Sequence, residues 1–69
     1  MPAVLIRQLE NLQKVMTLVT TPDQRETLLQ HARLVLETGD QSVPQAADRH
    51  DIQVAYDTLV GVSNDIWEG

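Results

Sequence analysis

Large apolar side chains recur at helical spacing from Ala3 to Thr20, and this spacing constrains the fold more than any other feature of the sequence. Intervals of four, three, four and three residues separate Leu5, Leu9, Leu12, Met16 and Val19. Residues spaced in this way share one face of an α-helix. Glu10 and Lys14 fall on the opposite side in the favourable i, i+4 order. The pattern predicts an amphipathic helix over about residues 3–20.

A second helix begins at a boundary that the sequence marks clearly. The Thr21 hydroxyl can cap the helix, Pro22 suits the first helical position, and Gln24 completes a capping box. The apolar side of this helix is formed by Leu28, Leu29, Ala32, Val35 and Leu36. Gly39 stands where a left-handed residue commonly ends a helix. We therefore expect the second helix over residues 22–38.

Residues 40–47 predict a connecting loop. They are mostly polar or small, and Pro44 favours extended backbone at Val43. A loop of this length would leave the following helix free to cross the first two at an angle. The much shorter link between the first two helices predicts that they pack as antiparallel neighbours.

A third and shorter helix is expected over residues 48–60. Its apolar side is formed by Ile52, Ala55, Tyr56 and Leu59. Asp48 suits the cap of this helix, and Gly61 suits its end. No β-branched run with a period of two supports a strand. The sequence thus predicts an all-α three-helix bundle over residues 1–62, followed by a tail over residues 63–69.

The chain is too short to bury a large core. A domain of 69 residues buries only about 60% of the surface that its unfolded chain exposes. The sequence contains no cysteine, which excludes disulfides and thiolate metal sites. Small domains without such cross-links often gain stability from oligomerisation. We therefore expect a homo-oligomer, or contact with a parent or partner protein.

Charge and hydropathy limit where the chain acts and what it binds. The net charge is −5 with only five lysines and arginines, and nucleic-acid binding needs clustered basic residues, so we expect no nucleic-acid partner. No apolar run approaches the roughly 20 residues that would span a bilayer. The short apolar run of residues 3–6 lacks the basic region of a signal peptide. We expect an acidic, soluble, cytoplasmic protein with no membrane insertion of this segment.

Nothing in the sequence indicates an enzyme, a cofactor site or a metal site. Ser42 and Ser63 have no nucleophile motif around them, and the three glycines occur singly. The alternative is a small ligand- or ion-sensing domain, in which His31 or His50 acts with nearby aspartates. The histidines lack metal-binding spacing, and capping and the helix dipole explain the aspartates near a helix start.

Four side chains are candidate contacts with another protein surface. Leu34 lies away from the apolar side of its helix, and contact with the third helix is the alternative. Leu5 and Leu9 belong to an amino-terminal end that is apolar on several sides. Trp67 follows Ile66, and this pair either folds back over the bundle or docks on a partner. We expect a protein-interaction or assembly domain that uses these residues.

Several short segments follow one another along the chain: Pro2-Ala3-Val4-Leu5-Ile6-Arg7, Leu9-Glu10, Thr21-Pro22-Asp23-Gln24-Arg25, Leu28-Leu29-Gln30-His31-Ala32-Arg33, and Ser42-Val43-Pro44 with Ala47-Asp48-Arg49. Their order resembles the carboxyl-terminal end of an uncharacterised bacterial family of predicted integral membrane proteins. The resemblance covers roughly residues 2–59, with Gln8 standing where the family prefers an apolar residue. It implies a cytoplasmic terminal domain whose parent chain is anchored in the inner membrane. It implies no catalytic residue.

Overall fold

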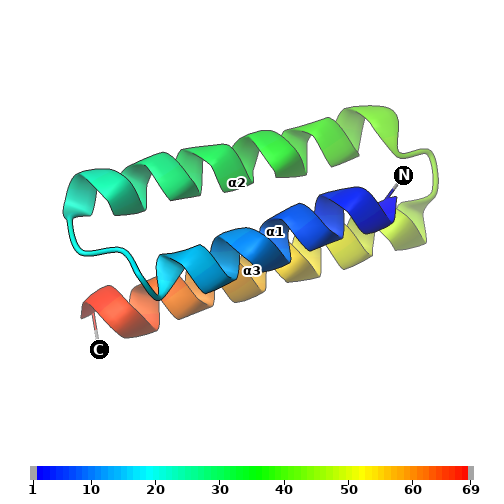
Figure 1. The fold of residues 1–69 in the computed structure, drawn as a ribbon. Helices are drawn as coiled ribbons and strands as arrows, with labels where there is room; N and C mark the ends of the chain where they lie inside the picture. The colour runs from blue at the N-terminus through cyan, green and yellow to red at the C-terminus, as the bar shows by residue number, and fades with distance from the viewer. Residues whose placement is uncertain (1, 69) are drawn as a thin grey trace.

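The computed structural model describes residues 2–68, and it shows an all-α bundle of three helices (Figure 1). The helices are α1 (Pro2–Met16), α2 (Pro22–Ser42) and α3 (Ala46–Glu68). Each helix contacts both of the others. Following the chain in Figure 1, α2 runs opposite to α1, and α3 runs in the direction of α1. The predicted fold class is confirmed, with the helices aligned along a body of 36 × 18 × 14 Å.

The core lies between the three helices and follows the predicted apolar positions. Its buried members are Leu9, Leu12, Met16, Ala32, Val35, Val43, Ile52 and Leu59. Ser63 is the polar residue buried beside them, with an exposed fraction of 0%. Apart from Val43, which lies just after α2, these residues come from all three helices, so none of the helices can bury its apolar side without the other two.

The first helix ends four residues earlier than predicted, at Met16. Beyond it the amide of Leu18 donates to the carbonyl of Val15 over 2.9 Å, and the Thr17 hydroxyl donates to the carbonyl of Lys14 over 2.6 Å. Bonds of three-residue span tighten and close the last turn. The run from Thr17 to Thr21 also contains several β-branched residues, which disfavour helix.

The second helix begins as predicted, at the Thr21 cap. The Thr21 hydroxyl accepts from the amide of Gln24 over 3.2 Å. The side-chain oxygen of Gln24 in turn accepts from the amide of Thr20 over 3.1 Å. This second bond differs from a standard capping box by one residue, since it does not reach the cap residue itself. The reciprocal bonds fix the linker against the start of α2.

The second helix continues past Gly39 to Ser42, so the predicted end at residue 38 is wrong. Neither Gly39 nor any other described residue has a positive φ. A Cβ at Gly39 would lie 2.9 Å from Cδ1 of Ile52, so the glycine lets α2 approach α3 closely. The helix ends where Val43 takes the extended geometry that Pro44 predicts, with φ −96° and ψ 116°.

The loop before α3 is much shorter than predicted, because only residues 43–45 lie outside the helices. Arg49 closes it, since its Nη1 donates to the carbonyls of Val43 and Pro44 over 2.8 and 2.9 Å. The short connection keeps α3 alongside the other helices, as Figure 1 shows, and the expected angled crossing is not found.

The third helix is the longest of the three at 23 residues, not the shortest as predicted. It passes through Gly61 and includes residues 63–68 of the predicted tail; Gly69 lies outside the described residues. No side chain or neighbouring helix lies within 4 Å of a Cβ built on Gly61, so packing does not require a glycine at this position. The buried Leu59 and Ser63 hold the helix against the bundle on both sides of this glycine.

Within residues 2–68, none of the helices combines the length and the apolar character needed to cross a lipid bilayer.

Candidate interaction surface

A groove opens at the end of the bundle where α1 stops. With 15 residues, α1 is shorter than α2 and α3, and residues 17–21 cross from its end to the start of α2 (Figure 1). The groove encloses about 480 Å³ and is lined by Val15, Leu18, Val19, Asp23, Gln24, Thr27 and Leu28. It therefore lies between the last turn of α1, the linker and the first two turns of α2.

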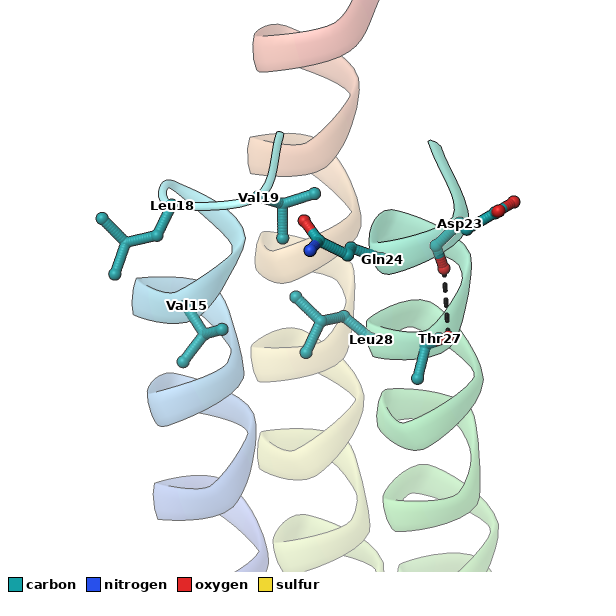
Figure 2. Close-up of a pocket in the computed structure, with 7 residues that line it drawn as sticks. All are labelled: Val15, Leu18, Val19, Asp23, Gln24, Thr27 and Leu28. Atoms are coloured by element: carbon teal, nitrogen blue, oxygen red, sulfur yellow. Dashed lines mark hydrogen bonds between the residues drawn. The ribbon is translucent and has the colours of Figure 1, made fainter. Parts of the chain in front are cut away.

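The walls of this groove are mostly apolar (Figure 2). Val19 and Leu28 are half-buried, and each packs against the core. Leu18 is 77% exposed and projects from the linker, while Val15 is 45% exposed on the last turn of α1. Asp23 is the charged member of the lining, and Figure 2 shows its carboxylate directed away from Leu28. An apolar hollow beside a projecting leucine is suited to contact with another protein surface.

The sequence pattern does not indicate this groove. It predicts that Leu28 and Val19 face the core and that a regular helix continues through Leu18. The sequence does indicate that Leu18 is exposed, because this residue falls opposite the stripe formed by Leu9 and Met16. That position is exposed whether the helix continues or ends.

The structure does not bring together the four predicted contact residues Leu5, Leu9, Leu34 and Trp67. Leu9 is 0% exposed at the centre of the core, so the prediction that it contacts another protein is wrong. Leu9 lies where the three helices meet, so its side chain is not accessible from outside the bundle. Leu5 is half-buried against the core, with Cδ1 3.5 Å from the Cβ position of Gly39.

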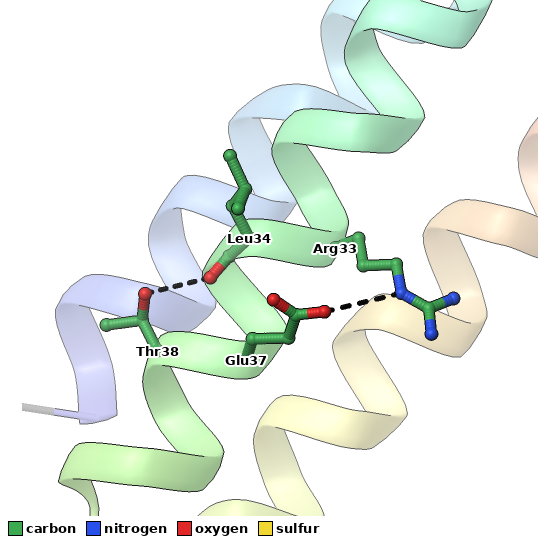
Figure 3. A network of polar contacts seen from close by, with 4 residues as sticks. All are labelled: Arg33, Leu34, Glu37 and Thr38. Atoms are coloured by element: carbon green, nitrogen blue, oxygen red, sulfur yellow. Dashed lines mark hydrogen bonds and ion pairs between the residues drawn. The ribbon is translucent and has the colours of Figure 1, made fainter.

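Leu34 is 61% exposed on α2 and is not packed against α3. Figure 3 shows it beside an exposed ion pair between Arg33 and Glu37, with Nε and Oε1 3.5 Å apart. Its carbonyl accepts from the Thr38 hydroxyl over 2.8 Å. The alternative of contact with the third helix is therefore excluded, and contact with another chain stays a prediction.

Trp67 packs within the molecule, on α3 beside the start of α2. The guanidinium carbon of Arg25 lies 6.0 Å from the centre of the indole ring. Arg25 also donates from Nε to the buried Ser63 hydroxyl over 2.7 Å, and from Nη2 to Oδ1 of Asn64 over 3.4 Å. The indole Nε1 is buried and has no hydrogen-bond acceptor among the described residues. One arginine thus joins the last turns of α3 to the first turn of α2.

Replacing Arg25 with alanine is expected to lower the free energy of unfolding by about 1 kcal/mol, because it removes a charged donor from a partly exposed site. It also uncovers the chain's single tryptophan, so the fluorescence emission of Trp67 should shift to the red. Arg33→Ala is the matched control, since its ion pair is exposed on the same helix. A blue shift, or equal effects of the two variants, would contradict the role given to Arg25.

The two histidines occupy separate exposed positions, His31 on α2 and His50 on α3. Over residues 2–68, no three histidine, aspartate or glutamate side chains come together in an arrangement that could hold a metal ion. The sensing alternative therefore gains no support from the geometry.

Comparison with models of known protein families, with curated proteins and with solved structures found no match for this chain.

Proposed function

We propose that this chain is a small helical assembly domain that acts by binding another protein surface at the groove beside Leu18. The observation that carries the proposal is the exposure of Leu18, at 77%, next to a largely apolar hollow. Burying a leucine side chain contributes about 1.5–3 kcal/mol, so a partner that covered it would gain substantially. Leu34, exposed further along α2, offers a second contact.

The small size of the domain supports the same function. A chain of 69 residues keeps a large share of its apolar surface exposed, and association is a common way to cover it. The resemblance to the carboxyl-terminal end of a bacterial membrane-protein family suggests the setting. In that setting the domain lies on the cytoplasmic side of the inner membrane and assembles its parent chain with itself or with a partner.

Site-specific photo-crosslinking tests whether the groove meets protein in the cell. A photoreactive phenylalanine at position 18 should give discrete crosslinked adducts, whose second component is identified by mass spectrometry. The same residue at position 54 is the control, because Val54 is 49% exposed on α3 and does not line the groove. No adduct at position 18, or the same adducts from both positions, would count against the proposal.

A further inference from the structure

We propose that residues 62–68, the carboxyl-terminal segment of α3, detach from the bundle as one unit while the rest of the protein stays folded. The segment opens about Gly61, Arg25 holds it closed, and opening releases the indole of Trp67. The observation that carries this is a change along α3. Before Gly61 the helix is held by the apolar core, and after it the helix is held mainly by one arginine.

The apolar core does not extend into the carboxyl-terminal segment. In α3 the residues of the core, or packed against it, are Ile52, Ala55, Tyr56 and Leu59. None of the described side chains beyond Leu59 belongs to this cluster, and Ile66 is 46% exposed. In Figure 1 the last turn of α3 extends past the end of α1. A segment with few apolar contacts opens at a lower free energy than the core does.

Arg25, in the first turn of α2, makes the polar contacts that hold the segment closed. Its Nε donates to the buried hydroxyl of Ser63 over 2.7 Å, and its Nη2 donates to Oδ1 of Asn64 over 3.4 Å. Its guanidinium carbon lies 6.0 Å from the centre of the Trp67 ring. Among the described side chains, these are the hydrogen bonds that join one helix to another. Because one residue makes all three contacts, they are lost together.

Gly61 is the position at which α3 can bend away from the bundle. A Cβ built there would meet no side chain or neighbouring helix within 4 Å, so packing does not account for a glycine. Glycine in a helix interior is less stable than alanine, because its backbone loses more conformational freedom when it becomes helical. Opening at Gly61 restores that freedom.

Two features of the segment oppose the contacts of Arg25. The indole Nε1 of Trp67 is buried without an acceptor among the described residues, and it gains hydrogen bonds with water when the segment opens. Asp65 and Glu68 lie near the end of α3, whose last turn has no basic residue. Negative charge is unfavourable at the carboxyl end of a helix. The position of this equilibrium therefore controls whether Trp67 is covered by Arg25 or accessible to other molecules.

Amide hydrogen exchange of the full chain, followed by NMR where reclosing is faster than chemical exchange, tests the proposal. Amides of residues 63–67 should share one protection factor, at least tenfold below that of residues 52–59. Ile52→Val weakens the core alone, so it should speed exchange of residues 52–59 about two- to tenfold and leave residues 63–67 unchanged. Arg25→Ala should speed both groups about fivefold, because its contacts are lost in both the open and the unfolded states.

Gly61→Ala tests the position of the bend. It should slow exchange of residues 63–67 about two- to fivefold, because alanine favours the helical state that opening disrupts. Unchanged exchange in this variant would overturn the proposal, as would protection that falls residue by residue towards the end of α3. Faster exchange of residues 63–67 in Ile52→Val would also overturn it, since the segment would then unfold only with the whole bundle. Unchanged exchange of these residues in Arg25→Ala would contradict the role of Arg25.

Discussion

Replacing Leu9 with alanine is expected to lower the free energy of unfolding by about 2–5 kcal/mol. Leu9 is fully buried where all three helices meet, so the substitution removes apolar contacts and leaves a cavity. A domain of this length has a total stability of roughly 3–10 kcal/mol. The variant should therefore lose a large part of its stability, and at the upper end of the range it would not fold at room temperature.

Leu34→Ala is the matched control for this experiment, since the same side chain is removed from a position that is 61% exposed. Its effect should stay within about 0.5 kcal/mol. Urea denaturation followed by far-ultraviolet circular dichroism measures both variants. A loss of unfolding free energy below about 1 kcal/mol at Leu9, or similar losses at both positions, would mean that the core between the helices is not the main source of stability.

Replacing Gly39 with valine is expected to lower the free energy of unfolding by about 2–3 kcal/mol. The added Cβ alone would lie 2.9 Å from Cδ1 and 3.4 Å from Cγ2 of Ile52, and Leu5 is 3.5 Å away on the other side. The two methyl groups of valine extend further into this space, so α2 and α3 must separate or Ile52 must leave its position. The cost exceeds the few tenths of a kcal/mol gained because valine forms helix more readily than glycine.

Gly61→Val isolates the packing effect, because the change in helix propensity is the same and no side chain or neighbouring helix lies within 4 Å of its Cβ position. This variant should be as stable as the parent protein or slightly more stable. Thermal unfolding separates the two, since 1 kcal/mol shifts the melting temperature of a small domain by about 4–8 °C. Equal melting temperatures would show that α2 and α3 do not approach closely at Gly39.

Local chemistry accounts for the features that the sequence predicted correctly. The spacing of Leu5, Leu9, Leu12 and Met16 identified the core side of α1. The Thr21 cap and Pro22 placed the start of α2, and Pro44 predicted the extended backbone at Val43. These features depend on residues within a few positions of one another, so the sequence alone is sufficient to predict them.

The candidate surface could not be predicted in the same way. The sequence indicates that Leu18 is exposed, because this residue lies off the apolar stripe of its helix. The hollow beside it forms only where the last turn of α1, the linker and the first turns of α2 come together. The sequence left open whether Trp67 folds back over the bundle or docks on a partner. Its contact in the structure is with Arg25, which lies 42 positions away in the chain. Neither feature follows from neighbouring residues.

The sequence by itself determined three amphipathic helices, their order and most of the core, because helical periodicity, capping and proline geometry act over short distances. The sequence pattern did not predict the end of α1, and only the tertiary structure decided where α2 and α3 end. Gly39 and Gly61 resemble terminators in isolation, yet both lie within helices. At Gly39, close packing against Ile52 favours a residue without a Cβ inside the helix; at Gly61, buried residues on either side keep α3 on the bundle. A glycine ends a helix only when the chain gains more from turning than from continuing to pack.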